Sequence, residues 1–287
     1  MKNKLFITLL LSSLALVGCD KQPQSQATAP PTTDTATPSK LPADAQTYVV
    51  GVDANYAPFA LNDEKGNVIG FDKDILDAIG ENQGFRVNAV GSIWDNIFTN
   101  LNVNKFDLVG SAVTITPERQ TTMDFSKPYI ESYIAIAYKN PAITSFVQLK
   151  TKKIAVQKGA YSIDILKKNG INPENMIEFK TGFLAYQAML TGKTDAVCDD
   201  VNVIDYSTKQ LKSLADTSQV KHIRPPVTET DLVGFAIKKG RKDLVDKVNK
   251  GLDNIKQNGM YDKIYAKWFG NNAVIISASS SASTAKN

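Results

Sequence analysis

Four stretches of the sequence place polar and aromatic residues where a strand is predicted to end or a helix to begin. They are Asp53–Phe59, Trp94-Asp95, Ser111–Arg119 and Asp199-Asp200. In open α/β sheets, ligands bind outside the carboxyl ends of the strands, so these residues are candidates for contacting a small molecule. Each has a simpler alternative when taken alone. Asp53 and Asp200 could cap a turn or helix, Trp94 could be a core aromatic, and Arg119 a surface charge.

The scarcity of histidine and cysteine argues against two kinds of catalytic site. The chain has one histidine, His222, and two cysteines, Cys19 and Cys198. A catalytic thiol would need a histidine base, and a zinc site needs several histidine or cysteine ligands. We therefore expect no catalytic thiol and no zinc or other transition-metal site. We also assign no cofactor and no catalytic residue. Cys198 is expected to be a small buried hydrophobe at the end of a strand.

Strands and helices alternate between Tyr48 and Gly270, in two successive sets. Helical periods at Phe71–Gly84 and Ile93–Asn104 lie between β-rich runs, and the alternation restarts at Lys152 after a break near Lys139-Asn140-Pro141. The spacing predicts an α/β fold with mostly parallel sheets flanked by helices. A second crossing near residues 228–231 would complete a two-segment hinge. We expect residues 47–139 plus 231–271 to form lobe 1, and residues 140–230 to form lobe 2.

The N-terminus has the features of a lipoprotein signal. Lys2 and Lys4 precede an apolar run, Leu5–Val17, which is shorter than the roughly 20 residues of a membrane span. The run ends in Leu16-Val17-Gly18-Cys19, which resembles a bacterial lipobox. Residues 1–18 are expected to be a cleaved signal peptide, and Cys19 to be acylated, which leaves Cys198 without a disulfide partner.

The segments that flank the folded region are expected to be disordered. Residues 19–46 follow the lipidated cysteine as a polar tether, and residues 272–287 form a serine-rich tail. Asp20 resembles an inner-membrane retention signal of Gram-negative lipoproteins. The formal net charge is +4, and no basic stripe indicates nucleic-acid binding. We expect a monomer on the periplasmic side of the cell membrane, anchored in the bilayer through Cys19.

Seven stretches together resemble family 3 of the bacterial solute-binding proteins, the polar amino-acid-binding receptors of ABC importers. They are VGVDANYAPFAL, GNVIGFDKDI, SIWDNI, FDLVGSAVTITPERQTTMDFSKPY, KKIAVQKGAY, TDAVCDD and NGMYDKIYAKWFG. The resemblance covers nearly all of residues 48–270, and TITPERQ…DFSKPY is its most specific part. It implies the two-lobed type II periplasmic-binding-protein fold, an amino-acid ligand, and a permease partner in the inner membrane.

The resemblance also implies which residues contact the ligand. Arg119 resembles the guanidinium that grips the α-carboxylate, with Thr114 and the backbone near Ala112 as helpers. Asp200 resembles the acceptor for the α-ammonium. Tyr56 and Trp94 resemble the aromatics around the side chain. The full expected set is Asp53, Tyr56, Trp94, Ser111, Ala112, Thr114, Arg119, Gln157, Tyr161 and Asp200.

The identity of the ligand stays open at this point. Asp53 resembles an acidic pocket floor, which favours a basic or amide side chain over an acidic one. Ala112 replaces a serine of some basic-amino-acid binders, and Gln157 replaces a lysine of some glutamine binders. Tyr161 is bulky where a small residue is frequent, and the Trp94-Asp95 pair also occurs in cystine binders.

Two other function classes compete with solute binding. Periplasmic cyclohexadienyl dehydratases share this fold, and Asp53 or Asp200 could then be an acid or base. An adhesin or signalling lipoprotein could keep the fold and use only its surface, but the retained clamp residues disfavour that role.

Overall fold

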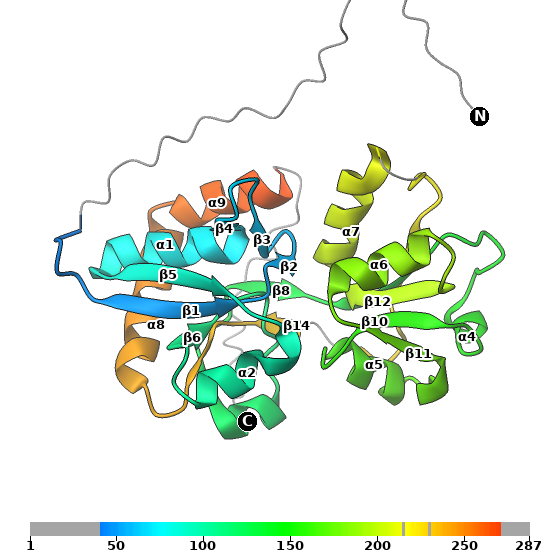
Figure 1. The fold of residues 1–287 in the computed structure, drawn as a ribbon, viewed down its shortest axis with the longest axis horizontal. Helices are drawn as coiled ribbons and strands as arrows, with labels where there is room; N and C mark the ends of the chain where they lie inside the picture. Colours follow the sequence, from blue (N-terminus) through cyan, green and yellow to red (C-terminus); the bar gives the residue numbers. More distant parts are fainter. Residues whose placement is uncertain (1–40, 214–215, 229–230, 271–287) are drawn as a thin grey trace, which may run out of the picture. The chain divides into compact units, whose positions relative to one another are not determined.

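The computed structural model describes residues 41–213, 216–228 and 231–270. The expected signal peptide, Cys19, most of the tether and the tail lie outside these residues. Figure 1 shows two sheets, each with helices packed on its faces. Within the described ranges, no helix has the length and apolar character needed to cross a bilayer.

The first sheet grows from β1 (Thr47–Val52), whose alternate side chains are buried on opposite faces. The strand order is β5-β1-β6-β15-β7. Strands β5 (Arg86–Gly91) and β6 (Leu108–Val109) run parallel to β1, whereas β15 (Ala236–Lys238) is antiparallel to β6 and to β7 (Met123–Phe125). We call this sheet and its helices lobe 1.

Helices cover both faces of the lobe 1 sheet. Val50 and Val52 pack with buried residues of α1 (Phe71–Gln83), α8 (Lys242–Gln257) and α9 (Met260–Phe269). On the other face, α2 (Trp94–Asn102) contributes Ile97 and Leu101 to a separate core. A short meander of β2 (Asn55–Tyr56), β3 (Ala60–Asn62) and β4 (Val68–Ile69) precedes α1, and α3 (Pro117–Thr122) precedes β7.

The second sheet has the order β11-β10-β12-β9-β13, and we call it and its helices lobe 2. Strand β10 (Ile154–Gln157) runs parallel to β11 (Met176–Phe179) and β12 (Ala196–Asp200). Strand β9 (Ile134–Tyr138) is antiparallel to β12 and to β13 (Lys221–Ile223). Cys198 is buried in β12, as expected.

Helices also cover both faces of the lobe 2 sheet. One core joins the sheet to α4 (Phe146–Leu149) and α5 (Ser162–Lys168), and another joins it to α6 (Gly182–Leu190) and α7 (Val201–Gln210). Two short 3₁₀ turns, η1 (Pro173–Asn175) and η2 (Leu211–Ser213), complete the lobe. The expected α/β class, with helix-flanked and largely parallel sheets, is confirmed.

Two strands connect the lobes and pair with each other. Strand β8 (Ile130–Ser132) is antiparallel to β14 (Asp231–Val233), with Ser132 opposite Asp231. Strand β8 leads into β9 of lobe 2, and β14 leads into β15 of lobe 1. The expected boundary at residue 139 is therefore too late, because β9 pairs with β12 and has already crossed into the second sheet.

Two β-rich stretches of the sequence, residues 106–113 and 231–239, form only short strands. Residues 231–239 form β14 and β15 rather than one strand. The break is at Gly234, whose N–H donates to the Val113 carbonyl at 3.0 Å. Residues 106–113 form a strand only at β6, because the chain turns at Ser111.

Candidate functional site

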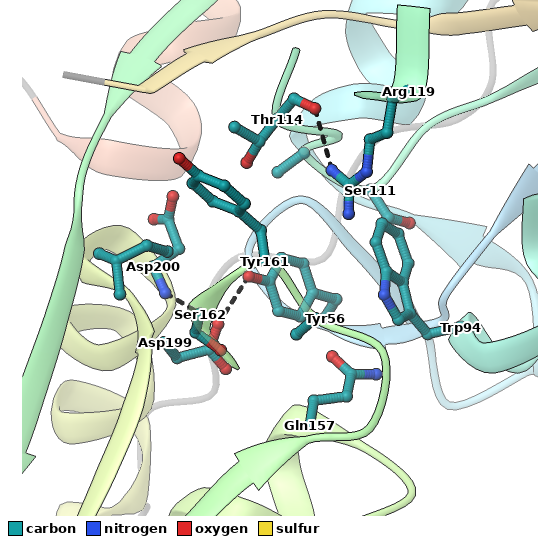
Figure 2. Close-up of a pocket in the computed structure, with 13 residues that line it drawn as sticks. Tyr56, Trp94, Ser111, Thr114, Arg119, Gln157, Tyr161, Ser162, Asp199 and Asp200 are labelled. Atoms are coloured by element: carbon teal, nitrogen blue, oxygen red, sulfur yellow. Dashed lines mark hydrogen bonds between the residues drawn. The ribbon is translucent and has the colours of Figure 1, made fainter. Parts of the chain in front are cut away.

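A cavity lies between the two lobes, at the ends of the strands that the sequence singled out (Figure 2). Lobe 1 supplies one wall through β2, α2, the turn after β6 and α3. Lobe 2 supplies the other through the β10–α5 turn and the end of β12. The lining residues are Tyr56, Trp94, Ser111, Ala112, Thr114, Arg119, Ile134, Gln157, Ala160, Tyr161, Ser162, Asp199 and Asp200.

Arg119 presents a positive charge to the cavity from the first turn of α3. Thr116 caps this helix by accepting a hydrogen bond from the Arg119 backbone N–H at 3.2 Å. Arg119 Nη1 donates to the Thr114 carbonyl at 2.9 Å, and the guanidinium carbon lies 5.1 Å from the Phe98 ring centroid. Burial lowers the pKa of Arg119 from its usual value. No carboxylate of the described chain forms an ion pair with Arg119, so its remaining donors suit an incoming carboxylate.

The turn after β6 brings two backbone N–H groups to one point. Ser111 and Ala112 have φ values of 83° and 51°, which non-glycine residues adopt at a cost. Asp72, at the start of α1, accepts hydrogen bonds from both N–H groups and a third from Tyr129 Oη at 2.7 Å. Burial raises the pKa of Asp72 to about 6. Asp72 therefore holds the cavity-lining turn in its left-handed conformation.

Two adjacent carboxyl groups end strand β12 and form the acidic part of the lobe 2 wall. Asp200 caps α7 by accepting from Asn202 N at 2.8 Å, and burial raises its pKa. Asp199 Oδ1 accepts from Tyr56 Oη at 2.7 Å and from Asp200 N at 2.8 Å. Burial raises the pKa of Asp199 to about 7, and the charges of Asp200 and Asp53 add to the effect.

Direct polar contacts join the two walls. Besides the Tyr56–Asp199 bond, Trp94 Nε1 donates to the Gly159 carbonyl at 3.0 Å. At the surface, Lys158 Nζ lies 2.8 Å from Asp95 Oδ2. The lobes are therefore held together by the same aromatic residues that line the cavity.

Asp53 lies elsewhere than the sequence indicated. It was expected at the cavity floor between Tyr56 and Trp94, but it is buried behind the lining. Its Oδ2 accepts from Gln157 Nε2 at 2.6 Å, and its Oδ1 accepts from the Asn55 N–H at 3.1 Å. Asp53 is therefore bonded to the lining residue Gln157 but is not among the described lining residues itself.

The other nine expected residues line the cavity together. The expected contact set left out four lining residues, namely Ile134, Ala160, Ser162 and Asp199, although Asp199 stood in one of the candidate stretches. Ser162 is notable because its Oγ is buried and has no hydrogen-bond partner within the described structure. The sequence offered weak clues to two of them, since Asp199 adjoins Asp200 and Ser162 follows Tyr161.

Comparison with known proteins places this arrangement in a family. Residues 48–271 match the model of the bacterial extracellular solute-binding proteins, family 3. The chain belongs to this family. The expected family and its solute-binding role are thereby confirmed.

Individual relatives agree with this membership. The chain is 32% identical over 274 residues to a probable histidine-binding protein of Neisseria gonorrhoeae. The aligned region covers 94% of this chain and 96% of the relative. An ancestral arginine-binding protein bound to glutamine is 37% identical, with a TM-score of 0.70 over 78% of this chain and 98% of its own. The ancestral amino acid-binding protein AncCDT-1, described as a precursor of cyclohexadienyl dehydratase, is 36% identical, with a TM-score of 0.70 over 78% of this chain and 95% of its own.

Proposed function

We propose that this chain captures a polar L-amino acid between its two lobes and delivers it, chemically unchanged, to an ABC permease. The observation that carries the proposal is the charge arrangement of the cavity. Arg119 on lobe 1 has donors suited to an α-carboxylate, and Asp200 on lobe 2 is a carboxyl group suited to an α-ammonium. A ligand with both charges would neutralise both walls, whereas an unmatched buried charge costs several kcal/mol.

The remaining lining contributes to the same task. Tyr56, Trp94 and Tyr161 offer aromatic surface for the ligand's side chain, and Ser111, Ala112 and Thr114 lie beside Arg119. The unpartnered Ser162 Oγ offers a further polar contact. Basic and amide amino acids, and cystine, are the candidate ligands.

Calorimetric titration tests the proposal. The full chain, purified in detergent, is titrated with the twenty amino acids, cystine and ornithine. We expect at least one basic or amide amino acid, or cystine, to bind with an affinity well above that of aspartate and glutamate. If no amino acid binds, or if an acidic one binds best, the proposal is wrong.

We further propose that the mature chain is a lipid-anchored monomer on the periplasmic side of the cell membrane. The support is the Leu16-Val17-Gly18-Cys19 sequence after a short apolar run. If the host is Gram-negative, Asp20 favours the inner membrane, where the permease would receive the ligand.

Replacing Cys19 by serine should abolish the lipid anchor. The acylated lipid group is attached to the cysteine through a thioether bond, which needs the thiol. We therefore expect the Cys19→Ser chain to incorporate no labelled palmitate and to leave the membrane fraction. Metabolic labelling followed by fractionation measures both. Cys198→Ser is the matched control, since it removes the other thiol and should keep the label. Palmitate on the Cys19→Ser chain would exclude the assignment.

An enzymatic role is the second candidate, and the raised pKa of Asp199 favours it. A buried carboxyl group with a pKa of about 7 could act as a general acid beside a substrate. The binding role accounts for Arg119 and Asp200 without a reaction, so we expect no formation of phenylpyruvate from prephenate. Turnover that is lost in Asp199→Asn would establish the enzyme instead.

A further inference from the structure

The cavity has one more carboxyl group than a zwitterion needs. Arg119 is the single cationic side chain among the described lining residues, and Asp199 and Asp200 are the two acidic ones. If an α-amino acid uses Arg119 and Asp200, as proposed above, Asp199 remains beside the ligand without a counter-charge. Asp53 is not among the described lining residues, and its two oxygens accept from Gln157 and Asn55.

The two carboxylate oxygens of Asp199 differ in the number of described hydrogen bonds that they accept. Both of its described hydrogen bonds, from Tyr56 Oη and from Asp200 N, go to Oδ1. Oδ2 lies beside Gly182, the first residue of α6, where a Cβ would come within 2.9 Å of it. Glycine therefore allows the carboxyl group and the Tyr56 ring to approach α6 closely.

We propose that Asp199 sets the charge selectivity of the site by exchanging its proton for the positive charge of a cationic ligand side chain. This inference rests on the amino-acid-binding function proposed above. A neutral side chain leaves Asp199 free to keep its proton below about pH 7. A cationic side chain displaces the proton to solvent and leaves an ion pair in the cavity.

The surroundings of Asp199 supply the reason for this exchange. The titratable groups that face it are Tyr56 from β2, Asp53 from the turn after β1, and Cys198 and Asp200 from β12. None is a cation, and burial raises the pKa of Asp199 to about 7. An opposite charge within roughly 4–6 Å lowers a carboxyl pKa by about 1–3 units. Binding of a cation near neutral pH should therefore release a proton.

The proposal is tested with ligands that differ in charge but little in shape. L-Arginine and L-lysine are titrated into the full chain alongside the neutral L-citrulline and L-glutamine. We expect arginine or lysine to bind about tenfold more tightly at pH 8 than at pH 6, because only the ionised Asp199 pairs with them. Citrulline should show no such gain. Calorimetry in buffers of different ionisation enthalpy should detect proton release with the cation alone.

Asp199→Asn provides the decisive variant. Asparagine can still accept from Tyr56 and Asp200 N, so the fold should persist, as a thermal melt will check. We expect this variant to bind the cationic ligand at least about tenfold more weakly at pH 8, to lose the pH dependence, and to keep citrulline affinity within about threefold. Asp205→Asn, an exposed change on α7 of the same lobe, should alter none of these values.

Each contrary result bears on a different part of the argument. If the wild type binds neutral amino acids but neither arginine nor lysine, or if Asp199→Asn weakens both classes equally, Asp199 does not set charge selectivity, although the amino-acid-binding role stands. If the wild type binds no amino acid in either charge class, the amino-acid-binding role fails as well.

Discussion

Replacing Arg119 by alanine should weaken the binding of every amino-acid ligand by roughly a hundredfold to several thousandfold. The α-carboxylate is common to all of them, and the guanidinium is the one cation among the described lining residues. Removing one partner of a buried charged pair costs about 3–5 kcal/mol, and about 1.4 kcal/mol corresponds to a tenfold change in affinity. Titration calorimetry of the variant against the best wild-type ligand measures the loss.

Two further variants show whether the loss comes from the guanidinium itself. Arg119→Lys keeps a positive charge but loses the planar pair of donors, so its affinity should fall between those of the wild type and Arg119→Ala. Arg241→Ala removes an arginine from the same lobe that pairs with Asp107 and Asp243, and should leave affinity unchanged. Wild-type affinity in Arg119→Ala would refute the proposed carboxylate contact.

The Arg119→Ala variant should be nearly as stable as the wild type without ligand. Its side chain makes one described hydrogen bond, to the Thr114 carbonyl, and no described ion pair. Burial also disfavours its charge, as the lowered pKa shows. Thermal denaturation without ligand should therefore separate a binding defect from a folding defect.

The parts of the fold that depend on local sequence were predictable. Helix α1 follows from the spacing of Phe71, Ile75 and Ile79, and it ends where Gly84 adopts a left-handed conformation. Arg119 could be assigned to the cavity because the short stretch around it resembles the most specific motif of the family. In both cases the determining residues lie within a few turns of one another.

The parts that depend on contacts between distant segments were not predictable. Strand β9 belongs to lobe 2 because it pairs with β12, which lies far along the chain. The displacement of Asp53 depends on Gln157, 104 residues away, and the position of Asp199 depends on Tyr56, 143 residues away. A single sequence does not show which of its distant residues are in contact.

The role of Asp72 became evident only from the structure. Replacing Asp72 by alanine should destabilise the chain severely. The variant would leave the Ser111 and Ala112 N–H groups and the Tyr129 hydroxyl without their acceptor. Each buried donor left unsatisfied costs about 1–3 kcal/mol, so we expect a loss of about 3–6 kcal/mol in the free energy of unfolding. Urea denaturation without ligand measures it.

Asp72→Asn is the matched control, because asparagine has nearly the same shape. Its Oδ1 can accept from both N–H groups, while its Nδ2 can donate to the Tyr129 hydroxyl, which then acts as an acceptor. We therefore expect a small change in stability at neutral pH. An equal loss in the alanine and asparagine variants would show that the hydrogen bonds are not what Asp72 contributes.

The wild type and the Asp72→Asn variant should also differ in how their stability depends on pH. Burial raises the pKa of Asp72 to about 6 in the folded chain, against about 3.9 in the unfolded chain. A raised folded-state pKa means that this group's stabilisation is complete below about pH 4 and is lost as the pH rises through 6. Relative to Asp72→Asn, the wild type should lose about 2 kcal/mol of stability between pH 4 and pH 7.

The cost of ionising Asp72 at neutral pH is linked to its role in fixing the turn at Ser111 and Ala112. At neutral pH the carboxylate bears a desolvation cost that its three hydrogen bonds only partly offset. In return, both N–H groups converge on one acceptor, and Ser111 and Ala112 keep the left-handed conformation that places them in the cavity wall. A stability difference between wild type and Asp72→Asn that stays constant from pH 4 to pH 7 would contradict this account.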